Sequence, residues 1–368
     1  MFEAIKKLIS GTKNSGPRPV PYRKGESICG IDIGSGSIKV VQVKEEKGKI
    51  VLETYGALSL APFAGEAIGK PARLDTATLA KAVTQALQES RVTAKQFVAS
   101  FQSNAILVFT LQLPVSTKDK LDSVIPTEAR KYIPVPLTEV SLDWFIIPEK
   151  DIDDIGVSSS TMSVLVVALR NEVLQNYQDI FTQATIPNPS FEIEIFATMR
   201  SVLGREIAPI MIADIGTGYS SVAIVEYGTI RLFHIINRGS SFVTETIMRS
   251  TSTSFDKAEE LKFNIAKHPE MDKVALTAHQ YLISEMKRTL LEYEREHGRT
   301  VAKIILTGGG STVAGFKELV DQEISVEVIM GNPFNKVDAP DFLRPLLITS
   351  GPQFSVATGL ALKNMLSF

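Results

Sequence analysis

The stretch that most constrains the fold is Ile28 to Val43, in which two apolar runs flank a Gly-Ser-Gly-Ser sequence at 34–37. The second run, Ile38 to Val43, is rich in β-branched residues and has no helical period. The pattern therefore predicts a strand, a tight turn and a second strand. A Rossmann loop or a P-loop would open into a helix at this point instead.

The turn has the composition of an anion-binding site. Gly34 and Gly36 let the backbone reverse sharply and leave amide groups uncovered, and a nest of free N–H groups binds anions. Ser35 and Ser37 add hydroxyl donors of the right length for phosphate oxygens. Asp32, at the mouth of the first strand, is placed to hold a hydrated Mg²⁺ ion. A stretch of this kind that occurs once is more often an ordinary hairpin turn.

The sequence then repeats this stretch. Asp214 to Val222 aligns without a gap on Asp32 to Val40, at an offset of 182 residues, and each copy lies between two hydrophobic runs. An internal repeat of this kind decides the architecture of a chain. Two anion-binding hairpins about half a chain apart predict two related lobes that close on one phosphate chain.

Composition limits the classes of function. The formal net charge of −2 argues against general nucleic-acid binding, and 368 residues are too many for one small core. Cys29 is the only cysteine, so no internal disulfide can form, which fits a reducing cytoplasm; we expect its thiol to be buried in a strand. The four histidines do not have metal-ligand spacing. No apolar run approaches the roughly 18 residues of a membrane span, and no secretory signal is visible.

Strand and helix patterns predict a mixed α/β chain with an inserted part. The expected segments are a flexible N-terminal extension (1–26), a first lobe (27–113), an inserted interaction subdomain (114–187), a connecting strand and helix (188–208), a second lobe (209–250 and 300–345), a helical subdomain (251–299) and a closing segment with a helix over 353–365 (346–368). The N-terminal extension is either a disordered tail or a short amphipathic helix and linker in weak contact with a membrane or partner.

The inserted subdomain has a simple predicted order and no catalytic constellation. A charged helix over 117–132 is ended by the prolines at 134 and 136, because proline cannot continue a helix. The elements expected after it are two strands and a helix (141–148, 161–169, 171–184). The first lobe is expected to hold a helix capped by Asp75 and three further strands (50–60, 97–101, 106–113).

A third glycine-rich junction follows a predicted strand at 301–307. Gly308, Gly309 and Gly310 precede a helix expected from about Val313, and bare backbone near a helix N-terminus lets a flat ring or a ribose lie close. A lone glycine-rich turn is weak evidence. After two phosphate hairpins, it is interpreted as an adenosine site.

These features together resemble the actin, DnaK-type chaperone and sugar-kinase superfamily, whose fold is a ribonuclease H-like pair of lobes. A closer resemblance is to the PilM family, the cytoplasmic actin-like proteins of type IV pilus assembly, which are related to FtsA. The Lys-Tyr-Ile-Pro-Val-Pro stretch at 131–136 is the most telling match, since PilM-like and FtsA-like chains carry an inserted subdomain there. The other matching stretches are 30–39, 214–216, 284–290, 307–310 and 357–362.

The resemblance implies an ATP site with Mg²⁺ between the lobes. The phosphates would face one set of residues from each hairpin (Ser35, Gly36, Ser37 and Lys39; Gly216, Thr217 and Gly218). Asp32 and Asp214 would position Mg²⁺ and water, and Glu194 falls where active relatives carry a water-orienting side chain. Gly308, Gly309 and Lys287 would contact the nucleoside, beside Gly310.

The resemblance also implies a partner. PilM-like proteins are thought to bind the N-terminal cytoplasmic tail of PilN, a single-pass membrane protein, in a groove between the first lobe and the inserted subdomain. This chain would then lie in the cytoplasm at the inner face of the membrane. Contacts with the pilus motor ATPases and self-association are further expectations of the same kind.

Three functions remain open at this point. The first is a nucleotide-binding scaffold or switch, in which ATP changes the affinity for the partner and hydrolysis is slow or absent. The second is a small-molecule kinase, which needs a carboxylate base at the acceptor hydroxyl; the sequence offers no convincing aspartate for that role. The third is an FtsA-like membrane tether, which needs a C-terminal amphipathic helix that is not visible here.

Overall fold

The computed structural model describes residues 24–147, 160–264 and 272–366, and these form two compact units. The larger unit comprises residues up to Gln102 and from Ile180 onward, and the smaller one comprises Ser103–Asp179. Each unit is described below by itself. Of the expected N-terminal extension, only residues 24–26 lie within the described part of the chain.

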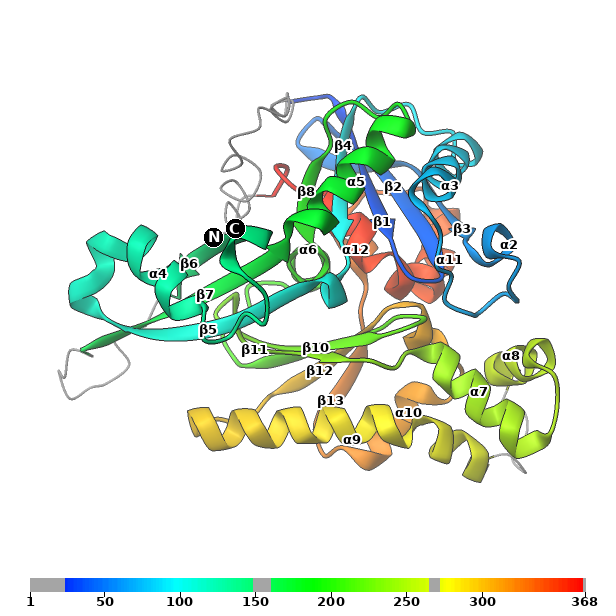
Figure 1. Ribbon diagram of the computed structural model, residues 1–368. Helices are drawn as coiled ribbons and strands as arrows, with labels where there is room; N and C mark the ends of the chain where they lie inside the picture. Colours follow the sequence, from blue (N-terminus) through cyan, green and yellow to red (C-terminus); the bar gives the residue numbers. More distant parts are fainter. Residues whose placement is uncertain (1–23, 148–159, 265–271, 367–368) are drawn as a thin grey trace. The chain divides into compact units, whose positions relative to one another are not determined.

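The larger unit contains two five-stranded sheets with the same strand order (Figure 1). The first sheet has the order β3-β2-β1-β4-β8, and the second has the order β11-β10-β9-β12-β13. In both sheets the first three strands of the order pair with one another in antiparallel fashion, and the last two run parallel to the central strand, which is β1 in the first sheet and β9 in the second. The strands of the first sheet are Ser27–Ile33, Ser37–Glu46, Lys49–Ser59, Gln96–Phe101 and Ser190–Ile193 (β1, β2, β3, β4, β8). Those of the second are Ile210–Ile215, Ser220–Glu226, Thr229–Ile236, Lys303–Thr307 and Glu327–Met330 (β9 to β13). The repeat seen in the sequence is thus a repeat of whole sheets.

Helices cover both sheets. In the first lobe, α3 (Thr76–Glu89) packs on β2 and β3, while α12 (Ser355–Ala361) packs on β1 and on α6 (Glu194–Val202). The Asp75 side chain accepts a hydrogen bond from the backbone N–H of Thr78 and so caps α3 as expected. In the second lobe, α9 (Asp272–His297) runs along the sheet in Figure 1 and contributes Leu282, Met286 and Tyr293 to its core. The other described helices of the larger unit are α2, α7, α8, α10 and α11 (Ala61–Ala64, Ser240–Thr251, Phe255–Asn264, Phe316–Glu323, Arg344–Ser350).

The helices α6 and α12 cross very closely, next to the start of the second lobe. A Cβ added at Gly359 would lie 1.8 Å from the carbonyl oxygen of Ala197, so only glycine fits there. The guanidinium of Arg200, a buried side chain on α6, donates to both carboxylate oxygens of Glu192 and to the carbonyl of Gly359. These contacts fix α6, which leads from the first sheet into the second.

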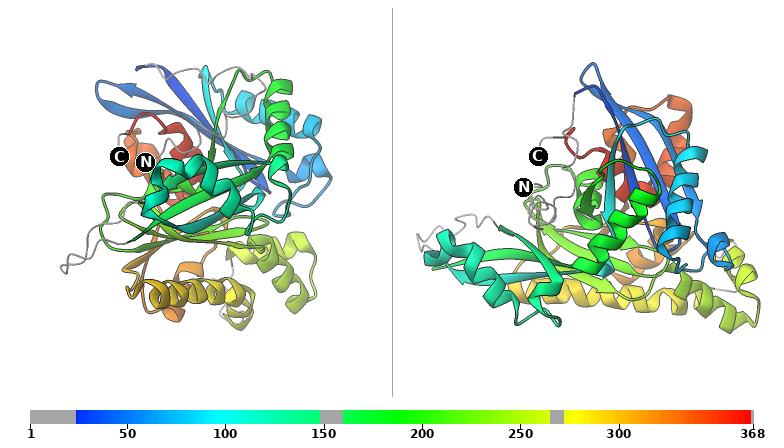
Figure 2. Two further views of the ribbon diagram at one scale, coloured as in Figure 1. Left: turned by 60° about the vertical axis from the view of Figure 1, so that its left-hand side comes forward. Right: turned by 45° about the horizontal axis from the view of Figure 1, so that its top comes forward.

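The smaller unit is a three-stranded antiparallel sheet of order β5-β7-β6 with the helices α4 (Leu121–Ala129) and α5 (Asn171–Gln183), the last turn of which passes into the larger unit (Figure 2). The strands are Ile106–Pro114, Thr161–Arg170 and Val140–Ile146 (β5, β7, β6). Leu111 of β5, Ile125 of α4 and Val164 of β7 meet in its core. The structure therefore places β5 in this unit, whereas the sequence pattern predicts 106–113 as part of the first lobe. An apolar strand pattern does not reveal which sheet the strand joins.

Three predicted helices differ in detail, and one helix is not predicted. The charged helix expected over 117–132 begins as a 3₁₀ turn and is helical only from Leu121 to Ala129. The helix expected from Val313 starts at Phe316, after Gly315 with a φ of 83°. The closing helix is α12 alone, shorter than 353–365, since Pro352 opens a 3₁₀ turn before it. Helix α11, with proline in its first turn, is not predicted from the sequence.

Candidate phosphate and metal site

The two hairpins have the same turn geometry and meet at their tips. The backbone N–H of Gly34 donates to Ser37 O at 3.0 Å, and that of Gly216 donates to Tyr219 O at 3.1 Å. Between the hairpins, Gly218 N–H donates to the Ser35 hydroxyl at 2.9 Å. A Cβ added at Gly36 would lie 2.5 Å from the Thr217 hydroxyl oxygen, so glycine is needed for this approach.

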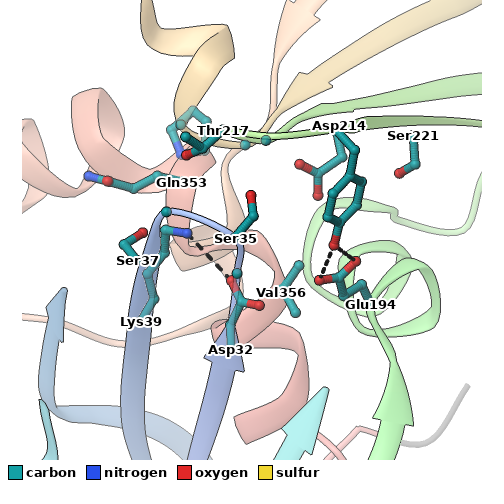
Figure 3. A pocket seen from close by; sticks show the side chains of 17 residues that line it. Asp32, Ser35, Ser37, Lys39, Glu194, Asp214, Thr217, Ser221, Gln353 and Val356 are labelled. Atoms are coloured by element: carbon teal, nitrogen blue, oxygen red, sulfur yellow. Dashed lines mark hydrogen bonds and ion pairs between the residues drawn. The ribbon is translucent and has the colours of Figure 1, made fainter. Parts of the chain in front are cut away.

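One pocket lies beneath the hairpin tips (Figure 3). It holds about 520 Å³ of space, counting the part open to solvent. Its lining comes from both hairpins, from the starts of α6 and α12, and from the turn after β12: Asp32, Gly34, Ser35, Gly36, Ser37, Lys39, Glu194, Asp214, Gly216, Thr217, Tyr219, Ser221, Gly308, Gly309, Pro352, Gln353 and Val356.

The first aspartate of the repeat is neutralised by the protein itself. Asp32 is buried, with 4% of its surface exposed, and its carboxylate lies 3.5 Å from the Lys39 ammonium. The Ser100 hydroxyl donates to the other carboxylate oxygen at 3.2 Å. Lys39 stands directly opposite Asp32 in the antiparallel β1–β2 register, so the pairing follows from the hairpin.

The second aspartate lacks a cation at the matching position. Asp214 faces Ser221 in the β9–β10 register, where the first copy has Lys39. Burial, together with the nearby charge of Asp32, raises the pKa of Asp214 from 3.8 to about 6. The ammonium of Lys39 acts in the opposite direction. A positive charge close to Asp214 would therefore stabilise the ionised form of its carboxylate.

A third carboxylate is held by a tyrosine of the second hairpin. The Tyr219 hydroxyl lies 2.8 Å from each carboxylate oxygen of Glu194, as the dashed lines in Figure 3 mark. Glu194 is 8% exposed and is the first residue of α6, where the helix dipole favours a negative charge. The carboxylate is thus oriented by one strong donor.

The glycines after β12 provide bare backbone at the other side of the pocket. Gly308 has a φ of 80°, and a Cβ there would lie 2.4 Å from an Asp214 carboxylate oxygen and 2.5 Å from Ile215 O. Its N–H donates to Pro352 O at 2.9 Å. Gly309 lines the pocket beside Gln353, and Gly310 is buried behind it, against Ile215 and Ser240.

Most of the site residues predicted from the sequence come together here, and three do not line the pocket. Gly218 and Gly310 support the lining from behind. Lys287 lies on α9, 41% exposed, and its ammonium pairs with Glu323 at 2.8 Å. Gly34, which the sequence indicates as part of the anion-binding turn, also lines the pocket. Five further lining residues are not predicted from the sequence: Tyr219, Ser221, Pro352, Gln353 and Val356. The first two sit inside the repeat, which is the signal that could identify them.

The residues present fit a phosphate-bound magnesium ion. In the described part of the chain, no group of three or more His, Cys, Asp or Glu side chains is placed to hold a metal by itself. Mg²⁺ needs only one or two carboxylates when phosphate oxygens and water complete its shell, and Asp32 and Asp214 line one pocket.

Among the described helices, none combines the length and apolar character that crossing a membrane requires.

Solved structures define the class of fold. A PilM–PilN type IV pilus biogenesis complex matches 94% of this chain and 100% of that one, with a TM-score of 0.77 and 23% identity. MreB5 of Spiroplasma citri bound to ADP matches 92% of this chain and 96% of its own, with a TM-score of 0.52 and 12% identity. The chain is an actin-like protein with two lobes, as its sequence predicted.

The family follows from the sequence comparisons. The family model for the type IV pilus assembly protein PilM matches residues 30–365. The cell division protein FtsA of Streptococcus pneumoniae is 25% identical over 342 residues, which span 81% of this chain and 74% of that one. The chain belongs to the PilM family of type IV pilus assembly proteins.

Proposed function

We propose that this chain binds ATP with Mg²⁺ between its two hairpins and uses the nucleotide to control its binding of a partner in type IV pilus assembly. The observation that carries the proposal is that both copies of the repeat line one pocket, with Asp32 and Asp214 in it. Membership of the PilM family supports the role in pilus assembly, and the ADP-bound MreB5 neighbour supports a nucleotide ligand.

Each part of the pocket has a role in this proposal. The hydroxyls of Ser35, Ser37 and Thr217 and the backbone of Gly36 hold phosphate oxygens. Gly216 and Gly218 hold the second hairpin in place, through the bonds of their N–H groups to Tyr219 O and to the Ser35 hydroxyl. Lys39 lies 3.5 Å from Asp32 and adds a positive charge beside them. The bare backbone of Gly308 and Gly309 takes the nucleoside, with Gly310 behind it.

Asp32 and Asp214 hold the metal side of the site. A bound Mg²⁺ ion supplies positive charge that screens the phosphates and relieves the repulsion between the two carboxylates. Asp214 gains most, because its pKa is already raised to about 6 by burial and by Asp32. Metal and nucleotide are therefore expected to bind together.

Hydrolysis is proposed to be slow. Glu194 is the residue whose carboxylate would orient an attacking water, and the Tyr219 hydroxyl already donates to both of its oxygens at 2.8 Å. A carboxylate engaged in this way has fewer free lone pairs for water. The protein then acts as a switch that keeps its nucleotide for long periods.

We propose that the partner is the N-terminal cytoplasmic tail of a PilN-like single-pass membrane protein. The solved structure of a PilM–PilN complex supports this choice, and such a partner would hold the chain at the inner face of the membrane. The unit Ser103–Asp179 lies outside the paired sheets and is the candidate docking module. On it, Tyr132 is 51% exposed and stacks on Phe109 with ring centroids 4.8 Å apart.

Titration calorimetry tests this proposal directly. ATP and ADP are titrated with Mg²⁺ into the wild type and into Asp214→Ala, each with and without a PilN-like tail peptide. We expect binding in the wild type, a large loss in the variant, and a change of nucleotide affinity when the peptide is present. Peptide binding should also weaken in Tyr132→Ala but not in the neighbouring control Lys131→Ala, whose side chain makes a surface ion pair with Glu128.

Two results would overturn the proposal. No nucleotide binding by the wild type would leave an actin-like scaffold without a switch. Tight nucleotide binding that the peptide does not change would direct attention to the small-molecule kinase alternative. Against that alternative, the carboxylates in the described lining of the pocket are Asp32, Asp214 and Glu194, and each already has a role here.

A further inference from the structure

One segment of the first lobe reaches across to the second lobe at the hairpin tips. This segment, residues 66–73, follows α2 and precedes α3, and we refer to it as the strap. In Figure 1 it lies on the side of the molecule where α8 is found. Its contacts connect three parts of the larger unit that are far apart in the sequence.

The strap contacts both phosphate hairpins. The backbone N–H of Ala72 donates to Ser35 O at 2.8 Å, which ties the strap to the first hairpin. Pro71 lies against the second hairpin, because a Cβ added at Gly218 would be 3.1 Å from the Cβ of Pro71. The strap therefore lies over the point at which Gly218 N–H donates to the Ser35 hydroxyl.

The strap also contacts helix α8. A Cβ added at Gly69 would lie 2.4 Å from the carboxyl carbon of Glu259, so the backbone of Gly69 rests directly on that side chain. The next residue, Lys70, places its ammonium 5.3 Å from the centre of the Phe255 ring, within the range of a cation–π contact. Gly69 has a φ of 95°, which glycine adopts without strain.

The carboxylate beneath Gly69 is rigidly held. The ammonium of Lys262, whose side chain is 1% exposed, lies 2.8 and 2.7 Å from the two carboxylate oxygens of Glu259. The Thr244 hydroxyl of α7 donates to the same carboxylate. Because Glu259 cannot move away easily, a side chain added at Gly69 must instead lift the strap.

We propose that the strap is a closing device for the phosphate site, and that its release sets the rate at which bound nucleotide exchanges. The strap joins the tips of the two hairpins, so the hairpins move apart and release a phosphate chain held between them only after the contacts of Ala72 and Pro71 are broken. The contacts of Gly69 and Lys70 with α8 provide the second attachment, on the other lobe. This inference rests on the proposed nucleotide function and adds a device that controls how fast the nucleotide is exchanged.

The test compares two glycines of the same loop. Gly69→Ala places a methyl group against Glu259, whereas Gly65→Ala at a φ of 65° meets nothing within 4 Å and serves as the control for backbone strain. The dissociation rate of a fluorescent ADP analogue is measured by chase with unlabelled ATP. We expect Gly69→Ala to release it about tenfold faster and the control to stay within about twofold of the wild type.

A second variant guards against misfolding. Lys70 has a 40% exposed side chain, so Lys70→Ala leaves the core unchanged and removes the contact with Phe255. It should speed release by a smaller factor, about threefold. The exposed lysine Lys81 on α3 gives the matched control Lys81→Ala. Equal release rates in Gly69→Ala and Gly65→Ala, with Lys70→Ala unchanged, would overturn the proposal.

Hydrogen exchange separates this test from that of nucleotide binding. In protein without nucleotide, amides of the strap such as Ala72, which donates to Ser35 O, should exchange about tenfold faster in Gly69→Ala than in Gly65→Ala. This readout does not need a bound ligand. Wild-type protein that binds no nucleotide but shows this difference would contradict the proposed function alone, whereas identical exchange in both variants would contradict the strap.

Discussion

The two copies of the hairpin fold alike but balance charge differently. In the first, Asp32 stands opposite Lys39 and forms an ion pair with it at 3.5 Å. In the second, Asp214 stands opposite Ser221, and its pKa rises to about 6. A single change of residue type in one register position thus leaves one aspartate opposite a lysine and the other opposite a serine. The repeat gives the site its shape, and the departure from the repeat leaves the carboxylate that the proposed function assigns to Mg²⁺.

The strands that carry the two aspartates differ as well. Gly30 of β1 is in the position that Ile212 occupies in β9, 182 residues later. A Cβ at Gly30 would lie 2.1 Å from Ala357 O, because α12 crosses β1 there. Ile212 is fully buried in its own lobe. The first copy has no side chain at this position, which lets α12 approach β1 closely. Val356 of α12 lines the pocket.

The largest expected effect concerns this close crossing. Changing Gly30 to Val, which makes the first copy more like the second, should lower the free energy of unfolding by about 3 kcal/mol or more, since backbone atoms of α12 must move. Urea denaturation measures the change. Gly204→Ala, where the added Cβ would meet only Glu206 at 3.6 Å, is the control and should cost less than about 1 kcal/mol.

The charge difference predicts opposite effects of two similar substitutions when no metal is present. Asp32→Asn removes the partner of Lys39, whose side chain is 14% exposed, and should destabilise the protein by about 2 kcal/mol. Asp214→Asn removes an uncompensated charge and should stabilise it at pH 8 by an amount on the order of 1–3 kcal/mol. Denaturation in the presence of EDTA compares the two. If both variants lose the same stability, the difference between the copies is not electrostatic.

The pH dependence gives the same comparison a sharper form. The pKa of Asp214 is raised from 3.8 to about 6, so the folded protein binds more protons than the unfolded chain between these values. The contribution of Asp214 to stability therefore falls as pH rises from about 4 to 6. The advantage of Asp214→Asn over the wild type should be full above pH 6 and should shrink toward zero near pH 4, as measured by denaturation at a series of pH values.

A smaller effect is expected at Tyr219, which replaces the serine found at the matching position of the first hairpin, Ser37. Tyr219→Phe removes the hydroxyl that holds both oxygens of Glu194 and leaves the ring in place. We expect slow ATP hydrolysis to rise several-fold, about 1 kcal/mol in barrier, with nucleotide affinity unchanged. Glu194→Gln should abolish that gain. A fall in rate would mean that the tyrosine positions the carboxylate for catalysis instead of restraining it.

The sequence predicts the hairpins well because both signals in them are local. The alternation of apolar runs and glycines fixes the turns, and the repeat of Asp32 in Asp214 indicates a shared pocket. Cys29 is buried in β1 as expected. The partner of β5 could not be predicted in the same way, because the choice between β7 and the first sheet depends on contacts distant in sequence.

The same limit applies to individual site residues. The hydrogen bond between Tyr219 and Glu194 joins side chains from different parts of the chain, and neither local sequence predicts it. The resemblance assigns Lys287 to the nucleoside, yet the position of α9 directs its ammonium to Glu323. Long side chains at the edge of a site take partners that only the packing of helices decides.

The central claim is that the uncompensated Asp214 and the paired Asp32 form one metal-dependent nucleotide site. The most direct test is the thermal unfolding midpoint of the wild type and Asp214→Asn, each measured with ATP in Mg²⁺ and with ATP in EDTA. Binding to the folded state raises the midpoint by mass action, here on the order of 5 °C at saturating ligand. The account predicts this rise of the midpoint only for the wild type, and only when ATP is added together with Mg²⁺. An equal rise in EDTA, or in Asp214→Asn, would contradict it.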